Sequence, residues 1–348
     1  MNTKLSVIIP LYNAEKFIEP TVQSIINQSF GFENIELLLI DDNSKDNTPQ
    51  IIKKLSDEYP NIKSIFLEGT SGSASKGRNV GIKNATTDYI MFLDQDDKYS
   101  ESMCEIMYNT IENEDVDIVM CNYKFYLHNK FKENKEELDL SYIKTDPKKN
   151  ELIFNDIFMW NKIFKKEFIL KNNILCPEKV LSEDMVFCIN AYLNTDEVIY
   201  LNNFHGYIYN IRDTEEDSST SNNISEESFL KLLEGYYLTI KLFREANRED
   251  LIPILMKTHF VTLISSFITL NAEVNKENKK DLINKLYEFK KYSNINYDLN
   301  EKWTISFMRN LEKKNYNLII FESDIIKQFY KSHKLRKFYR KFYNKSDY

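Results

Sequence analysis

Acidic residues directly follow two apolar runs of the chain, an arrangement that suits metal and phosphate chemistry. Asp42 comes after the run Ile35–Ile40, and Asp94 and Asp96 come after the run Tyr89–Leu93. If these runs are strands, side-chain alternation puts Asp94 and Asp96 on one side. Carboxylate oxygens are ligands that Mg²⁺ or Mn²⁺ prefers, and a few of them leave coordination positions for substrate phosphates. Taken alone, such clusters are more typical of solvated turns, so this interpretation needs support from elsewhere in the chain.

Glycine supplies that support, because it is scarce and concentrated in one segment. Only seven glycines occur in 348 residues, and four of them fall within thirteen residues: Gly69, Gly72, Gly77 and Gly81. This density indicates tight turns or a close approach of the backbone to a ligand. Lys76 and Arg78 lie in the same segment and suit a base edge or a diphosphate. The segment is neither a P-loop, since it lacks the Gly-Lys-Ser/Thr ending, nor a dinucleotide-binding glycine motif, since no strand precedes it.

The elements that must position these residues alternate between strand and helix over the first 125 residues. Four short runs rich in Ile, Leu and Val predict strands buried on both faces of a parallel sheet: Leu5–Pro10, Ile35–Ile40, Tyr89–Leu93 and Val116–Met120. Helices are predicted over Ala14–Asn27, with Asn13 as cap, and after Thr48 and Pro49. This alternation predicts a doubly wound α/β layer, in which ligands bind beyond the carboxyl ends of the strands.

The remainder of the chain has a different organisation. Residues 129–151 are charged and interrupted by Pro147, which predicts a connector. The polar run Asp213–Glu227 predicts a surface loop, and after Ser225 the pattern is helical to the end. At roughly 150 residues per domain, the length suggests two domains or one large domain with an appendage.

The composition is that of a globular protein, with 42% hydrophobic and 28% charged residues. The four cysteines show no paired short spacing, so we expect neither a zinc site nor a disulfide framework. A net charge of −7 argues against general nucleic-acid binding. No signal peptide precedes the first apolar run, and no stretch of roughly 18 apolar residues occurs, so we expect a cytoplasmic protein.

The C-terminal tail has a charge opposite to that of the rest of the chain. Residues 327–348 hold eight lysines and arginines against one aspartate, a net charge of +7, which leaves −14 for the remainder. Apolar residues form two stripes there at helical spacing: Ile325, Ile326, Phe329 and Tyr330, then Leu335, Phe338, Tyr339 and Phe342. Basic amphipathic helices lie on anionic membranes, so we expect peripheral attachment to the inner membrane face. The alternative is an ordinary helix whose stripe packs on the body of the protein.

Seven segments together resemble the signature blocks of family 2 glycosyltransferases. Four of them match in order and spacing: SVIIPLYN (Ser6–Asn13), LLLIDDNSKDNT (Leu37–Thr48), GSASKGRNVGI (Gly72–Ile82) and MFLDQDD (Met91–Asp97). Three more resemble the non-processive wall- and capsule-building members: WNKIFKKEFI (Trp160–Ile169), ILCPEKVLSEDMVF (Ile174–Phe187) and YIYNIR (Tyr207–Arg212). The resemblance implies a GT-A fold, a Rossmann-like, mostly parallel sheet flanked by helices. It covers roughly residues 4–215 and leaves the helical remainder unexplained.

The resemblance also implies which residues bind the nucleotide. Tyr12 matches a residue that lies against the uracil ring, with Pro10 lining the same pocket, whereas a core tyrosine is the structural alternative. Asp42 matches the carboxylate that accepts from the uracil imide, and Asp41 serves the turn. Arg78 matches an arginine beside the base and phosphates, with Asn79 bracing its loop.

The remaining nucleotide contacts fall near the proposed metal. Asp94 matches the ribose-side aspartate and Asp96 the ligand of Mn²⁺ or Mg²⁺, while Asp97 supports these residues or caps a helix. Arg212 matches a residue that neutralises the leaving diphosphate, and a surface salt bridge is the alternative. His205 is interpreted as a surface histidine.

The same family resemblance implies a catalytic base, which inverting transfer needs to deprotonate the acceptor hydroxyl. The chain has Glu183 and Asp184 at the family's acidic pair, and we assign the base to Asp184, with Glu183 as runner-up and a helix-start acid as the structural alternative. We expect the two side chains to diverge on a helix, so that only one is essential.

The sequence therefore predicts an inverting, metal-dependent enzyme that transfers one sugar from a UDP-sugar to a cell-surface glycan, teichoic-acid-like or lipid-linked acceptor. The processive members have membrane helices and a Gln-x-x-Arg-Trp motif, and neither occurs here. We expect a GT-A domain over 1–215, with a nucleotide-binding half near 1–125 and an acceptor half near 126–215, then a helical region over 216–348. Two alternatives are a catalytically idle scaffold of a glycan-assembly complex and, less favoured, a sugar nucleotidyltransferase.

Overall fold

The computed structural model describes most of the chain as two compact units. It describes residues 3–126, 140–149, 152–210, 225–268, 274–291 and 302–331. One unit comprises Met1–Asp213 with Gly235–Leu242, and the other comprises Thr214–Glu234 with Phe243–Tyr348. Four predicted features lie wholly or mainly outside the described residues: the connector 129–151, Arg212, the loop Asp213–Glu227 and the tail beyond Lys331.

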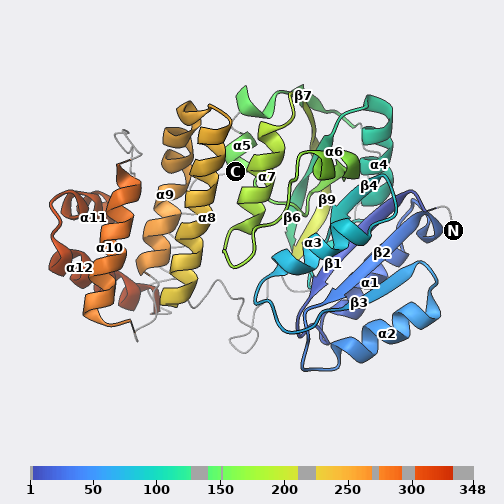
Figure 1. The fold of residues 1–348 in the computed structure, drawn as a ribbon, viewed down its shortest axis with the longest axis horizontal. Coiled ribbons are helices and arrows are strands. Elements are labelled where there is room, and N and C mark those ends of the chain that lie inside the picture. The colour runs from blue at the N-terminus through green and yellow to red at the C-terminus, as the bar shows by residue number, and fades with distance from the viewer. Residues whose placement is uncertain are drawn as a thin grey trace. The chain divides into compact units, whose positions relative to one another are not determined.

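The first unit is built around a sheet whose strand order is β3-β2-β1-β4-β8-β6-β9-β5 (Figure 1). Its parallel half consists of β3 (Ile62–Phe66), β2 (Ile35–Asp41), β1 (Leu5–Leu11) and β4 (Tyr89–Phe92). Every residue of β1 and β2 is buried, because their continuous apolar runs are covered on both faces. The predicted parallel α/β layer is thus confirmed for three of the four apolar runs, and the fourth run, Val116–Met120, leads into a strand of the other half of the sheet. The edge strand β3 was not predicted, because only its first residue is fully buried. It precedes the glycine-rich segment, so the expectation that no strand precedes that segment is wrong.

The other half of the sheet mixes strand directions. It consists of β8 (Lys162–Lys165), β6 (Ile118–Tyr126), β9 (Val198–Asn210) and β5 (Lys98–Tyr99), with β7 (Ile143–Thr145) paired to β9. β8 runs antiparallel to both β4 and β6, and β9 is parallel to β6 but antiparallel to β5 and β7. The long strand β9 therefore returns toward the segment that follows β4, where the predicted aspartates lie.

Helices cover this sheet, and their bounds are α1 (Ile18–Ile26), α2 (Thr48–Glu58), α3 (Ala74–Asn84), α4 (Met103–Glu114), α5 (Leu152–Asn155), α6 (Lys166–Lys171) and α7 (Glu183–Leu193), with short 3₁₀ turns at Phe32–Asn34 and Pro147–Lys149.

Helix α3 packs closely on β1. A Cβ at Gly77 would lie 3.0 Å from Pro10 Cβ, and one at Gly81 would lie 2.3 Å from Ile8 Cγ2. These two glycines therefore serve helix–sheet packing. Gly69 and Gly72, with φ of 74° and 77°, form the expected tight turns.

The second unit is helical in its described residues, as the sequence predicts. Its helices are α8 (Glu226–Glu245), α9 (Ile252–Ile268), α10 (Lys276–Lys290), α11 (Lys302–Glu312) and α12 (Tyr316–Lys331), with a 3₁₀ turn at Glu249–Leu251. The middle of α8 belongs to the first unit. Buried residues such as Phe260, Phe289 and Leu311 form the core of this unit.

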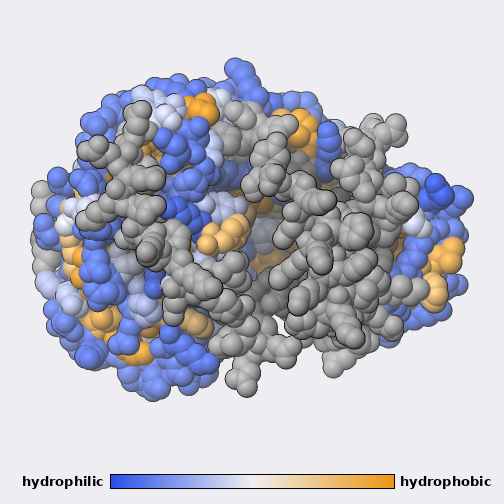
Figure 2. Space-filling view, turned by 180° about the vertical axis from the view of Figure 1, so that it is seen from behind, coloured by the Kyte–Doolittle hydropathy of each residue, from blue (hydrophilic) through white to orange (hydrophobic). Residues whose placement is uncertain are grey.

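The described helices are too short or too polar to cross a bilayer. On the face shown in Figure 2, the described surface is mainly hydrophilic, and its apolar residues form scattered patches.

Candidate active site

One buried arginine joins three carboxylates from separate parts of the first unit. Helix α3 carries Arg78, the end of β4 leads into Asp94, and the first turn of α7 carries Glu183 and Asp184. Arg78 Nη2 lies 2.8 Å from Asp94 Oδ1, while its Nη1 lies 3.0 Å from Glu183 Oε1 and 2.6 Å from Asp184 Oδ1. The Arg78 side chain is only 4% exposed. Because the guanidinium fork presents several donors in one plane, it can hold three acceptors at once.

The convergence of Glu183 and Asp184 contradicts our expectation that their side chains diverge. Both carboxylates contact the same nitrogen of Arg78. Helix α7 begins at Glu183, after Ser182 with a φ of 68°, so no preceding helical turn restricts these side chains. The extra methylene of Glu183 lets its carboxylate reach back toward the cation that Asp184 contacts.

Burial gives Asp184 the protonation behaviour of a base that works near neutral pH. Burial, as the largest cause, raises the pKa of Asp184 to about 7, and the charges of Glu183 and Asp94 act in the same direction. Arg78 and the backbone N–H of Met159 lower this pKa. A general base is most effective when its pKa is close to the working pH. Asp184 thus has the environment that proton transfer requires.

Asn79 fixes the segment that leads to the acidic pair. Its Nδ2 donates to the Cys176 carbonyl at 2.8 Å, and its Oδ1 accepts from the Cys176 N–H at 2.9 Å. Helix α3 therefore holds the 176–184 segment at both ends, through Asn79 and Arg78. Asn79 was expected to brace its own glycine-rich loop, whereas these two bonds of its side chain brace the distant segment at Cys176.

Asp97 ties the segment after β4 to strand β9. Its Oδ2 accepts from the Tyr207 hydroxyl at 2.6 Å, and its Oδ1 accepts from the Asn210 N–H at 2.7 Å. The same hydroxyl accepts from the Asp94 N–H at 3.4 Å. Burial, together with the neighbouring Asp94 and Asp96 charges, raises the pKa of Asp97 to about 8. Of its two predicted roles, Asp97 takes the supporting one, since it bonds to β9 and not to a helix end.

Gln95 is a positioning residue that sequence reasoning overlooked. Its side-chain amide accepts from the Tyr12 N–H at 2.8 Å and donates to the Tyr12 carbonyl at 3.2 Å. This bridge joins the end of β1 to the segment that carries Asp94 and Asp96. The Tyr12 side chain is 44% exposed, so the alternative of a core tyrosine is wrong. The only sequence signal for this role was the position of Gln95 between the aspartates.

Asp42 holds the glycine-rich turn in front of α3. Both of its oxygens accept from the Ser71 N–H at 2.9 Å, and Oδ2 also accepts from the Ser71 hydroxyl at 2.9 Å. Asp41 accepts from the Ser44 N–H at 3.1 Å, in keeping with the turn role expected for it. The structure thus places Asp42 beside the turn, while the uracil contact stays a prediction.

The other predicted residues occupy different surroundings. Pro10 lies in β1 against Gly77, Asp96 is half-buried beside Asp97, and His205 is exposed on β9. Within the described ranges, His, Cys, Asp and Glu nowhere form a group of three or more that could hold a metal. A cation at Asp96 would therefore depend on ligands from a bound substrate.

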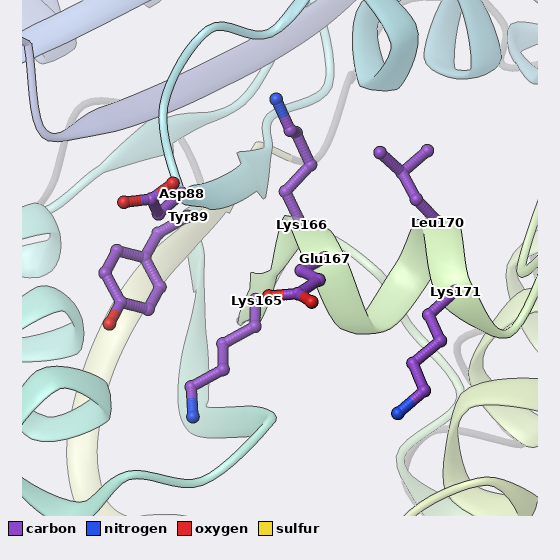
Figure 3. A pocket seen from close by; sticks show the side chains of 7 residues that line it. All are labelled: Asp88, Tyr89, Lys165, Lys166, Glu167, Leu170 and Lys171. Carbon is purple, nitrogen blue, oxygen red and sulfur yellow. The ribbon is translucent and has the colours of Figure 1, made fainter.

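A separate pocket lies at the opposite end of β4, where Asp88 and Tyr89 begin the strand. It has a volume of about 660 Å³ and is otherwise lined by Lys165, Lys166, Glu167, Leu170 and Lys171. Figure 3 shows Lys166 pointing away from Lys165 and Lys171. Lys166 donates to the Ala85 carbonyl and Lys165 pairs with Asp115, so internal contacts already engage both cations.

Comparison with known proteins identifies similar sequences and folds. The family model "Glycosyl transferase family 2" matches residues 6–170. The chain is 28% identical over 282 residues to the poly(ribitol-phosphate) beta-glucosyltransferase of Bacillus spizizenii, covering 79% of this chain and 43% of that protein. It is 28% identical over 295 residues to the poly(ribitol-phosphate) beta-N-acetylglucosaminyltransferase TarS of Staphylococcus aureus, covering 82% and 49%. The chain thus spans about half the length of these relatives.

Solved structures show the same fold over nearly the whole chain. The crystal structure of S. aureus TarS 1–349 in complex with UDP-GlcNAc has a TM-score of 0.70 and 23% sequence identity, and the match covers 94% of this chain and 92% of that one. The TarS 1–349 complex with UDP gives a TM-score of 0.69 over the same shares.

Proposed function

We propose that this chain is a family 2 glycosyltransferase, whose family model matches residues 6–170, and that it transfers a single sugar from a UDP-sugar to a cell-surface polymer. The predicted GT-A fold with a helical C-terminal part is confirmed by the likeness to TarS. The observation that carries the proposal is that Asp94, Glu183 and Asp184 all form ion pairs with the buried Arg78. It unites, beyond the end of β4, the acidic groups that sugar transfer requires.

The donor is proposed to be a UDP-sugar with a hexose or N-acetylhexosamine. TarS structures with UDP and with UDP-GlcNAc, and the names of the two relatives, support this class. The exposed Tyr12 ring offers a flat face for the uracil, with Pro10 nearby in β1. Asp42 and Arg212 complete the proposed contacts to the base and the diphosphate.

Transfer is proposed to proceed with inversion at the sugar. The acceptor hydroxyl gives its proton to Asp184 as its oxygen attacks the anomeric carbon and the bond to UDP breaks. Arg78 keeps the Asp184 carboxylate in place through the 2.6 Å contact, and Glu183 shares this cation as the alternative base. The proton remains on Asp184 until the product leaves.

Mn²⁺ or Mg²⁺ is the proposed cofactor, and the donor set fits it. Asp96 would hold the ion, because it stands at the position of the family's metal-binding aspartate and lies half-buried just beyond the end of β4. A single carboxylate suits these ions, because Mg²⁺ in particular binds to one or two carboxylates plus substrate phosphates. When bound, the ion would act as Lewis acid toward the departing diphosphate.

The acceptor is proposed to be a wall polymer of the teichoic-acid or glycan class, built at the cytoplasmic side of the membrane. Both relatives are named for poly(ribitol-phosphate), which supports an acceptor on a surface polymer. Attachment of the basic tail to anionic lipid would bring the enzyme to such an acceptor.

A donor screen tests this function. The chain would be incubated with individual UDP-sugars and Mn²⁺, and UDP release measured with and without wall polymer. We expect polymer-stimulated release with one donor, and at least a hundredfold slower release from the Asp184→Asn variant. If UDP-sugars bind but none is turned over, the idle-scaffold alternative is favoured.

A further inference from the structure

A row of aromatic rings covers one face of the paired strands β6 and β9. In the register of β6 with β9, Tyr123 lies beside Tyr207 and Phe125 lies beside Tyr209. Because side chains alternate along a strand, all four lie on one face of the pair. The ring centroids of Phe125 and Tyr209 are 5.7 Å apart, and those of Tyr123 and Phe125 are 5.4 Å apart. Trp160 stacks on Tyr207 at 4.1 Å. The rings therefore form a continuous layer, which the mechanism above does not use.

The inner end of this layer touches the acidic site. The Tyr207 hydroxyl bonds to Asp97 and to the backbone of Asp94. Asn210 bonds to Asp97 as well, so Tyr209 lies between two residues fixed to the same carboxylate. Tyr209 therefore lies in the part of β9 that is bonded to the segment carrying Asp94 and Asp96.

At the outer end of the layer, two of the rings are partly exposed. Phe125 is 58% exposed and Tyr209 is 37% exposed, whereas Trp160 is buried. Lys124, between Tyr123 and Phe125 in β6, alternates to the opposite face. An aromatic face carries negative charge density and attracts the weakly positive C–H groups of a flat apolar surface. A pyranose ring presents such a C–H face, while an acyclic polyol phosphate does not.

We propose that Phe125 and Tyr209 form an acceptor subsite that stacks against a sugar ring of the acceptor. The inference rests on the proposed function, since it places the acceptor beside the donor site. It narrows the acceptor to a polymer that already bears a pyranose near the hydroxyl that is modified. Tyr207, Trp160 and Tyr123 hold the two exposed rings in place.

Ligand-observed NMR tests the subsite directly. Saturation transfer would be measured from the UDP-loaded protein to three probes: cellobiose, N,N′-diacetylchitobiose and ribitol 5-phosphate. The variants would be Phe125→Leu and Tyr209→Leu, which keep apolar bulk without a ring, and Tyr209→Phe, which keeps the ring. Phe66→Leu is the matched control, because this aromatic side chain of β3 is 50% exposed and outside the layer.

We expect one disaccharide to receive saturation on its ring protons, and each Leu variant to weaken its binding about tenfold. Tyr209→Phe and Phe66→Leu should bind as wild type, and every variant should keep wild-type affinity for UDP. Absence of saturation for both disaccharides would overturn the subsite. So would stronger, Phe125-dependent binding of ribitol 5-phosphate, or a loss of UDP affinity in the Leu variants. Failure of the proposed function looks different, because the wild type would then neither bind UDP nor turn over any UDP-sugar.

Discussion

Replacing Arg78 with glutamine removes the cation that three carboxylates share. The side chains of Asp94, Glu183 and Asp184 are 29%, 16% and 21% exposed, so water screens their charges weakly. Removing one partner of a buried ion pair costs about 3–5 kcal/mol. Because the carboxylates keep some exposure, we expect about 3 kcal/mol, the lower end of that range. In a unit of this size, such a loss lowers the melting temperature by about 6–12 °C.

The sign of the pH dependence provides a sharper test. Arg78 lowers the pKa of Asp184, so its removal should raise that pKa above about 7. When folding raises the pKa of a carboxyl, the bound proton stabilises the folded state. This contribution is complete at a pH below the pKa in the unfolded chain, and it is lost as the pH rises through the pKa in the folded protein. The Arg78→Gln variant should therefore be more defective at pH 8.5 than at pH 5.5. Its pH–rate profile should also shift to higher pH.

Urea unfolding at the two pH values measures this effect. Lys53→Gln serves as the control, because Lys53 pairs with Asp57 on α2, the two side chains are 68% and 67% exposed, and such a pair should contribute less than about 1 kcal/mol. Arg78→Lys should fall between wild type and Arg78→Gln, since one ammonium cannot reproduce the guanidinium fork. Equal loss of stability at both pH values would refute the predicted shift in the pKa of Asp184. Wild-type stability of Arg78→Gln would show that the ion pairs of Arg78 do not stabilise the fold.

The remaining predictions concern the base, the metal and the tail. Asp184→Asn should keep UDP-sugar binding while kcat falls about 10³-fold, and wild-type turnover should rise with pH through about 7, where the carboxyl loses its proton. An inactive Glu183→Gln beside an active Asp184→Asn would reverse the assignment. Asp96→Ala should abolish transfer at a nearly unchanged melting temperature, and full wild-type activity in EDTA would contradict the metal role. A chain ending at Ser323 should stay in solution when anionic vesicles sediment the 348-residue chain at low salt, and equal sedimentation of both would contradict membrane attachment.

Local sequence was sufficient to predict the parallel half of the sheet. The runs that became β1 and β2 are continuously apolar, because both of their faces are covered. The acidic residues after β2 and β4 could be placed at one edge of the sheet, because parallel strands end on the same side. The helical C-terminal region followed equally from its periodicity.

Local pattern misplaced elements wherever distant residues satisfy the backbone. Helix α1 begins at Ile18 and not at Ala14, and residues 15–17 form a turn before it. In this stretch the Ala14 N–H donates to Thr48 Oγ1 at 2.7 Å and the Glu15 N–H donates to Asp46 at 3.0 Å, two contacts with a segment more than 30 residues away. Strand β9 lacks a continuous apolar run because exposed residues alternate along much of it.

Only the tertiary structure decided how the candidate site is assembled. Arg78 and Glu183 are 105 positions apart, and their contact depends on how α3 packs against β1 and where α7 begins. The sequence alone specified the types of these residues and the ends of the elements that carry them. Which carboxylates share the cation, and whether they converge or diverge, depends on distances between elements. Those distances are set by side-chain packing across the whole unit, which local periodicity does not encode.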